Sequence, residues 1–157
     1  MARKLVLRLG EILVGMGALT PFQRDEILMA QRRRARPFGL IAEQLFGVRP
    51  ETVEEAWAAQ YAQMADRVDP RRLRPDPLAL GMISRRQARQ FHVLPIEVLP
   101  EAMGGEVTFC TFESNLARAL RFVGWRVGRP ASFVIADPEP LRQAIEKAYT
   151  GTGIRAA

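Results

Sequence analysis

The sequence has 157 residues, of which 48% are hydrophobic and 25% are charged, and its formal net charge is +6. This length holds one ordinary domain or two small subdomains, and no apolar run approaches the ~18 residues of a membrane span. One cysteine and one histidine exclude an internal disulfide and a Cys/His metal cluster, and the single cysteine fits a reducing cytoplasm.

Residues 8–60 contain two copies of one sequence repeat. The first copy, RLGEILVGMGALTPFQRDEILMAQ, spans residues 8–31, and the second, PFGLIAEQLFGVRPETVEEAWAAQ, spans residues 37–60. When the two copies are aligned with a shift of 29 residues, identical residues coincide. Gly10 aligns with Gly39, Pro21 with Pro50 and Gln31 with Gln60. A fixed period of this size is typical of a repeated supersecondary unit. Two copies are too few for a solenoid, so the repeat predicts a duplication inside one domain.

Each copy is predicted to form a helix-turn-helix. In the first copy, apolar residues at helical spacing predict a short helix that ends at Gly17. Thr20 then begins a second helix with a capping box, and this helix is expected to run to about residue 32. The second copy repeats the plan with Gly47 at the turn and a last helix from Pro50 to about residue 63, although Arg49 is a poor N-cap.

The rest of the chain is predicted to be a connector followed by a small α+β unit. Residues 64–83 are rich in proline and arginine, which predicts a connector with one short strand. Residues 84–151 predict the order α-β-β-α-β-α, with Ser84 as an N-cap and a hairpin that turns at Gly104 and Gly105. The predicted fold class is therefore α+β, with a helical tandem-repeat subdomain over residues 1–63 and a loose tail over residues 152–157.

The sequence carries no pattern that predicts catalysis. The GxxxxGK[ST] phosphate loop is missing, and the acidic residues form no pair suited to general acid and base. His92 is expected to be structural, and Cys110 lies in the apolar run VTFCTF, where a buried structural thiol is expected. We therefore expect a protein that is not an enzyme and that has neither a cofactor nor a metal.

The first copy offers a candidate site for a phosphorylated ligand. Arg8 precedes the first helix, where its guanidinium, beside free N–H groups near Gly10, would hold a phosphate. Gln31 ends the second helix with an amide that can hydrogen-bond to a base edge or to a phosphate. Leu9 and Leu28 would form an apolar floor on which a purine stacks. The second copy would supply another half-site, which suits a ligand with two-fold symmetry.

These residues also allow a purely structural role and a role in DNA binding. In the structural role, two helical hairpins pack on each other, and Arg8 and Gln31 are solvated. In the DNA-binding role, the hairpins and the net charge of +6 would bind the phosphate backbone. DNA binding is disfavoured because acidic residues on both longer helices would face the duplex, at Asp25, Glu26, Glu51, Glu54 and Glu55. Nearly all the positive charge comes from arginine, which fits an anionic partner and a codon bias equally well.

The repeated motif resembles the MshEN domain. The resemblance rests on R-L-G-x-x-L-V-x-x-G-x-L with a glutamine at the twenty-fourth position and a second copy after a five-residue spacer. This domain is the N-terminal domain of type II secretion and type IV pilus ATPases, and it also occurs in some phage-adsorption-type glycosyltransferases. A weaker similarity, through FHVLPIEV and ADPEPLRQAIEKAY, extends the resemblance to about residues 8–150. The resemblance to this family implies binding of cyclic di-GMP, with polar contacts from Arg8 and Gln31 and apolar contacts from Leu9 and Leu28.

In the second copy the resemblance implies a matching half-site that is degenerate. Pro37 has neither charge nor N–H donor and stands where the motif has Arg or Lys, and Arg36, one residue upstream, is a candidate replacement. Losing a charged phosphate contact costs ~1.5–3 kcal/mol, which weakens binding ~10–100-fold. The remaining half-site positions are Phe38, Gly39, Trp57 and Gln60, and the further departures from the motif are Arg24, Phe46 and Glu113.

We therefore expect a cytoplasmic regulatory module that binds cyclic di-GMP. Its partner would be a secretion or pilus ATPase, or a glycosyltransferase, to which the module passes ligand occupancy. The alternative is a ligand-free docking domain of the same fold, which would bind such a protein to its membrane platform. Nucleic acid and a transmembrane segment are not expected.

Overall fold

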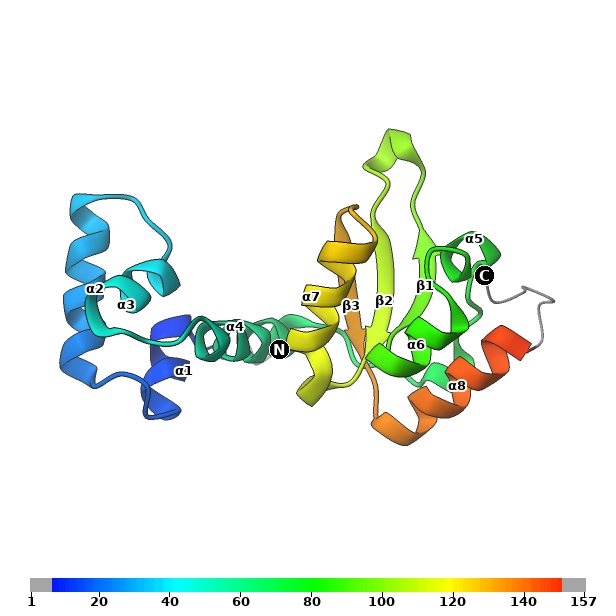
Figure 1. Cartoon of the computed structure of the whole chain (residues 1–157), viewed down its shortest axis with the longest axis horizontal. Helices are drawn as coiled ribbons and strands as arrows, with labels where there is room; N and C mark the ends of the chain where they lie inside the picture. The colour runs from blue at the N-terminus through cyan, green and yellow to red at the C-terminus, as the bar shows by residue number, and fades with distance from the viewer. Residues whose placement is uncertain (1–6, 151–157) are drawn as a thin grey trace, which may run out of the picture. The chain divides into compact units, whose positions relative to one another are not determined.

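The computed structural model describes residues 7–150 of the chain, which divides into two compact units, Met1–Met64 and Ala65–Ala157 (Figure 1). The expected tail over residues 152–157 lies outside the described residues. Two helix-turn-helix units come first, and a small α+β unit follows, so the predicted fold class is confirmed. Within residues 7–150, no helix combines the length and the apolar character that crossing a bilayer requires.

In its described residues the first unit consists of helices only. They are α1 (Leu9–Gly15), α2 (Pro21–Arg33), α3 (Phe38–Phe46) and α4 (Pro50–Met64). As predicted, Gly17 and Gly47 take positive φ values of 75° and 64° at the two turns. The Thr20 hydroxyl accepts from the Gln23 N–H at 3.1 Å, and the Gln23 side chain accepts from the Thr20 N–H at 2.9 Å. The predicted capping box therefore begins α2.

The core of the first unit repeats with the same period as the sequence. Residues one period apart occupy corresponding core positions, and each is at most 8% exposed: Leu13 and Ala42, Leu19 and Val48, and Ile27 and Ala56. The second copy therefore fills two of these positions with alanine, where the first copy has leucine or isoleucine. Because the buried positions agree, the duplication in the sequence is also a duplication of the packing.

Two buried glycines, one in each copy, let the helices of a hairpin approach each other. A Cβ at Gly39 would lie 2.5 Å from Cγ1 of Val53. A Cβ at Gly10 would lie 2.8 Å from Cζ of Phe38 and 3.1 Å from Cγ of Arg24. Val53 and Arg24 are themselves one period apart. In both copies the longer helix therefore packs a side chain against the glycine of the shorter helix.

The second unit begins inside the segment that was expected to be a connector. Residues 64–83 contain η1 (Pro70–Arg72) and α5 (Pro77–Leu80). The expected short strand is a single β-bridge between Arg67 and Ile135. Leu80 and Ile83 are buried. Proline and arginine dominate the composition of this segment, but its few apolar residues join the core, so it is part of the second unit.

A three-stranded sheet organises the second unit in the order β1-β2-β3. β1 pairs with β2 in antiparallel fashion, and β2 pairs with β3 in parallel, so α7 is the crossover between them (Figure 1). Helix α8 packs on β1 and β2. The helices and strands are α6 (Arg85–Phe91), β1 (Leu94–Val98), β2 (Val107–Thr111), α7 (Leu116–Arg126), β3 (Ala131–Ile135) and α8 (Pro138–Thr150), with short turns η2 (Glu101–Met103) and η3 (Glu113–Asn115). The predicted order α-β-β-α-β-α is confirmed.

Polar groups inside the second unit tie β2 to the end of α6. The Asn115 amide donates to the Phe91 carbonyl at 2.7 Å and to Oγ1 of Thr111 at 3.0 Å. The Thr111 hydroxyl in turn donates to the carbonyl of His92 at 2.9 Å. His92 ends α6 with a positive φ of 52°. Cys110 is buried, as predicted, and burial raises the pKa of its thiol to about 12, so the thiol stays protonated at neutral pH.

Gly39→Ala is expected to destabilise the first unit. The new methyl group would lie 2.5 Å from Cγ1 of Val53, and overpacking of this kind costs ~1–3 kcal/mol. Urea unfolding of the two proteins measures the loss. Gly15→Ala is the matched control, because a Cβ there meets nothing within 4 Å, and it should leave the midpoint unchanged or slightly higher. Equal midpoints for wild type and Gly39→Ala would contradict the packing described above.

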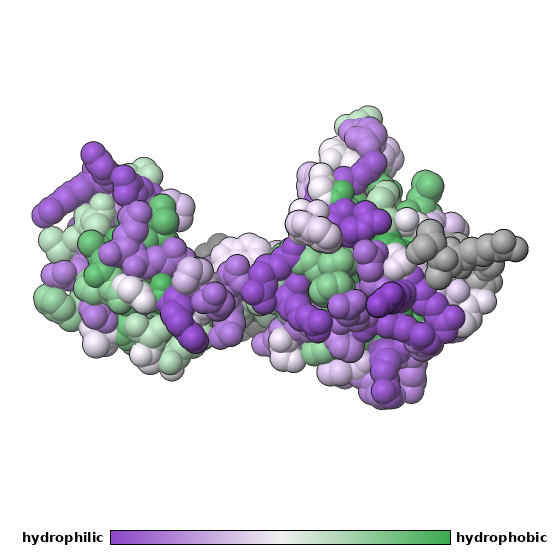
Figure 2. Space-filling view, in the orientation of Figure 1, coloured by the Kyte–Doolittle hydropathy of each residue, from purple (hydrophilic) through white to green (hydrophobic). Residues whose placement is uncertain are grey.

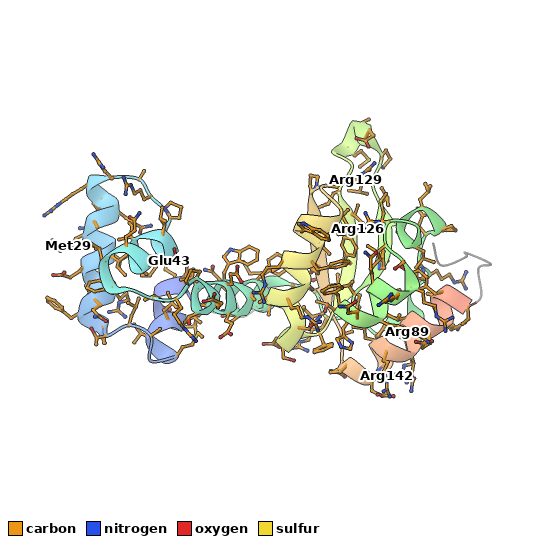
Figure 3. The ribbon with its side chains drawn as sticks, in the orientation of Figure 1. Met29, Glu43, Arg89, Arg126, Arg129 and Arg142 are labelled. Atoms are coloured by element: carbon orange, nitrogen blue, oxygen red, sulfur yellow. The ribbon has the colours of Figure 1, made fainter. Side chains whose placement is uncertain are left out.

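Acid is expected to remove the contribution of an ion pair between α6 and α8. Glu146 accepts from Arg89, which reaches from α6 toward α8 (Figure 3), and from Arg85 at 2.9 Å. These bonds lower the pKa of Glu146 from 4.5 to about 2. A lowered pKa in the folded state stabilises the fold above pH 4.5, and this stabilisation declines as the pH falls toward 2. The effect is small because the side chain of Glu146 is 39% exposed.

The measurement compares urea midpoints of wild type and Glu146→Gln across this pH range. We expect the wild type to be the more stable above pH 4.5 and the two midpoints to converge toward pH 2. A difference that stays constant from neutral to acid pH would show that the carboxylate does not contribute through its charge.

Candidate functional site

The first unit contains a cavity of about 520 Å³, which falls within the roughly 300–1,000 Å³ of small-molecule sites. Side chains from all four helices and from the residue preceding α1 line it. They are Arg8, Leu9, Gly10, Glu11, Arg24, Asp25, Leu28, Gln31, Phe38 and Gln60. Seven of the ten predicted site residues therefore lie together, and they come from both copies of the repeat.

Arg8 lines the cavity as the N-cap residue of α1. Its side chain is exposed, and its backbone N–H donates to Oε2 of Glu11 at 3.3 Å. The backbone N–H of Arg8 is therefore engaged by a side chain of its own helix. The reason is local, because an acidic side chain three residues into a helix folds back on the N-cap.

The apolar surface of the cavity comes from both copies. Leu9 and Leu28, the predicted floor, both line it, and Leu28 is 40% exposed. Phe38, which corresponds to Leu9 in the repeat, adds an aromatic ring from the second copy. This ring packs against Gly10, where it would lie 2.8 Å from a Cβ. The cavity therefore has an apolar wall wide enough to include an aromatic side chain.

The closing glutamines of both copies, Gln31 and Gln60, line the cavity and are half-buried. The Nε2 group of Gln31 donates to the carbonyl of Arg36 at 3.0 Å. This bond connects the end of α2 to the loop before α3 and fixes the orientation of the Gln31 amide. The two amides therefore bring hydrogen-bonding groups from both copies to one cavity.

Three predicted site residues do not line this cavity. Gly39 packs against Val53. Trp57 is 44% exposed, and its ring lies 5.7 Å from that of Tyr61. Arg36 donates from NH1 to Oε1 of Gln44 at 3.3 Å and lines a different cavity. Arg36, the candidate replacement for the arginine missing at position 37, therefore lies apart from the cavity that contains most of the predicted site residues.

Arg24 is a lining residue that the site prediction missed. Its Nε lies 3.1 Å from Oδ1 of Asp25, and its side chain is 31% exposed. The cationic groups that line the cavity are Arg8 and Arg24, and the carboxylates are Glu11 and Asp25. The sequence did contain a signal, since Arg24 stands where the repeat has Val53. Only the packing shows that this arginine faces the same cavity as Arg8.

A second cavity, of about 420 Å³, lies between the C-terminal part of α2 and α3. Met29 of α2 (Figure 3) and Leu45 of α3 line it, and they are 57% and 54% exposed. Its rim contains Arg33, Arg34 and Arg36. Figure 2 shows hydrophilic side chains next to apolar surface at this end of the first unit. In residues 7–150, no group of three His, Cys, Asp or Glu residues could hold a metal ion.

Comparison with known proteins identifies the fold. The family model of the MshEN domain matches residues 59–154, more than half of the chain. The structure of MshE with cdg is 22% identical and covers 91% of this chain and 99% of its own, with a TM-score of 0.50. The N-terminal domain of XpsE is 19% identical and covers 94% of this chain and 97% of its own, with a TM-score of 0.46. No curated protein matches the chain.

The family match and the sequence motif fall on different parts of the chain. The matched range begins at residue 59 and covers the second unit as far as residue 154. The motif that resembles the family most specifically ends at residue 60. The two observations are therefore independent of each other, and both lead to the same family.

Proposed function

Because this chain belongs to the MshEN domain family, we propose that its first unit binds cyclic di-GMP and regulates a partner protein in the cytoplasm. The partner would be a secretion or pilus ATPase, or a glycosyltransferase. The observation that carries the proposal is one cavity that gathers residues of both motif copies, Arg8, Leu9, Leu28 and Gln31 from the first and Phe38 and Gln60 from the second.

The chemistry of the cavity suits this ligand. Cyclic di-GMP has two purine bases, which the apolar surface of Leu9, Leu28 and Phe38 would cover. Its phosphates are anions, for which the guanidinium of Arg8 is a bidentate partner. The amides of Gln31 and Gln60 offer donors and acceptors to base edges or phosphates. A relative of the same fold, MshE, has a structure with this ligand, which favours it over other dinucleotides.

Arg8→Ala is expected to weaken the binding of cyclic di-GMP ~10–100-fold, because it removes a charged hydrogen-bond partner of a phosphate. Calorimetric titration measures the affinity, with GTP as a second ligand to test selectivity. For wild type we expect a micromolar or tighter constant, ~−8 kcal/mol or better. Arg49→Ala is the matched control, since Arg49 is an exposed arginine of the same unit and is not among the lining residues.

The urea midpoint of Arg8→Ala should equal that of wild type, because the Arg8 side chain is exposed. An unchanged affinity in a folded Arg8→Ala protein would remove Arg8 from the site. A wild-type protein that gives no heat with cyclic di-GMP would contradict the proposed function itself.

A second candidate function, protein docking without a nucleotide, is favoured by the second cavity of the first unit. Its lining combines the exposed apolar side chains of Met29 and Leu45 with three arginines. Under this alternative the chain ignores cyclic di-GMP and co-purifies with a secretion ATPase or a glycosyltransferase. Leu45→Glu should then abolish co-purification, because a charge enters the apolar contact. Co-purification that survives Leu45→Glu would contradict docking through this surface.

A further inference from the structure

The two phosphates of cyclic di-GMP raise a question about charge in the cavity. The first copy supplies Arg8, but its counterpart in the second copy is Pro37, which has no charge and no N–H donor. A ligand with two phosphates that met a single arginine would leave one anion without a cationic partner. Burying such an anion is costly unless a second positive group lies close by.

Arg24 is, with Arg8, one of the two cationic side chains among the lining residues. It comes from α2, in the first copy, and its aliphatic stem packs over Gly10. A Cβ added at Gly10 would lie 3.1 Å from Cγ of Arg24. Arg24 therefore packs on the start of α1, which Arg8 caps, and both side chains reach the same cavity. Asp25 accepts from Nε of Arg24 at 3.1 Å, which orients the guanidinium and engages one of its five N–H donors.

The repeat shows that packing alone does not require an arginine at this position. Val53 is the counterpart of Arg24 one period later, and it packs against Gly39 as Arg24 packs against Gly10. An aliphatic side chain is therefore sufficient for the contact between the two helices. The guanidinium of Arg24 adds a positive charge at the cavity, beyond what the fold needs.

Arg36, the arginine nearest to Pro37 in the sequence, is held elsewhere. Its NH1 group donates to Oε1 of Gln44 at 3.3 Å, and it lines the second cavity. Its backbone carbonyl accepts from Gln31, so the loop that carries it is fixed at that point. Proximity in the sequence does not bring this guanidinium to the proposed site.

We propose that Arg24 binds one phosphate of cyclic di-GMP and so replaces the arginine that the second copy lacks at Pro37. This inference rests on the proposed function and extends it. Both charged phosphate contacts would then come from the first copy, through Arg8 and Arg24. The second copy would contribute the ring of Phe38 and the amide of Gln60.

Arg24→Leu tests this assignment, because leucine keeps an aliphatic contact with Gly10 and removes the charge. Calorimetric titration with cyclic di-GMP should show a ~10–100-fold loss of affinity. Arg24→Lys keeps a charge but not the bidentate fork, so an intermediate affinity is expected. Arg36→Ala is the matched control and should stay within about twofold of wild type, since an exposed polar contact contributes little.

Salt provides a readout that a purely structural role would not change. If Arg24 contacts a phosphate, raising the ionic strength should weaken wild-type binding more steeply than binding to Arg24→Leu, because one screened charge pair is missing. The urea midpoints of the two proteins should be similar, which establishes that the variant is folded.

The outcomes of these titrations separate the two proposals. If the wild type binds and folded Arg24→Leu binds equally well with the same salt dependence, the role of Arg24 is overturned and the proposed function stands. If Arg36→Ala loses affinity and Arg24→Leu does not, Arg36 is the replacing arginine. If the wild type does not bind cyclic di-GMP at all, both proposals fail.

Discussion

The close approach of a long helix to the glycine of a short helix is the contact on which the first unit depends. Gly10 and Gly39 occupy equivalent positions, and side chains of α2 and α4 pack against them. A Cβ would lie 2.8 Å from the Phe38 ring at Gly10 and 2.5 Å from Val53 at Gly39, so a neighbouring side chain would have to move in either case. The cavity lies beside one of these contacts, so its shape follows from the same requirement. The site is therefore a consequence of how the hairpins pack, and not a feature added to their surface.

The sequence predicted most of the fold because the decisive signals were local. A period of 29 residues, glycines at both turns, the capping box at Thr20 and the N-cap at Ser84 can be recognised from short stretches of sequence. The role of residues 64–83 could not be read in the same way. Their proline and arginine content is typical of a linker, whereas Leu80 and Ile83 are buried, and their carbonyls accept from the hydroxyl of Tyr149 on α8. Composition describes a segment, but burial depends on what packs against it.

The candidate site was predictable in part for the same reason. Repeat positions identified Arg8, Leu9 and Gln31, because equivalent positions in a duplicated fold come close together around its pseudo-symmetric core. Arg36 and Arg24 were harder to judge. Arg36 is next to the position of the missing arginine in the sequence, but it lies in the loop before α3, where its guanidinium donates to Gln44. Arg36 accordingly lines the second cavity, while Arg24, sixteen residues after Arg8, lines the first.

The two copies of the repeat therefore bury corresponding positions but differ in the side chains that occupy them. Alanine replaces leucine and isoleucine at two core positions of the second copy, and Pro37 replaces the arginine at its start. The first copy gains a charge where the second has Val53. The carboxylates of Glu11 and Asp25 nevertheless line the same cavity as the two arginines. Asp25 already accepts from the guanidinium of Arg24, so an anionic ligand must compete with this carboxylate there. A ligand that also covers the apolar surface gains binding energy that a simple phosphate lacks, and this difference favours a nucleotide over inorganic anions.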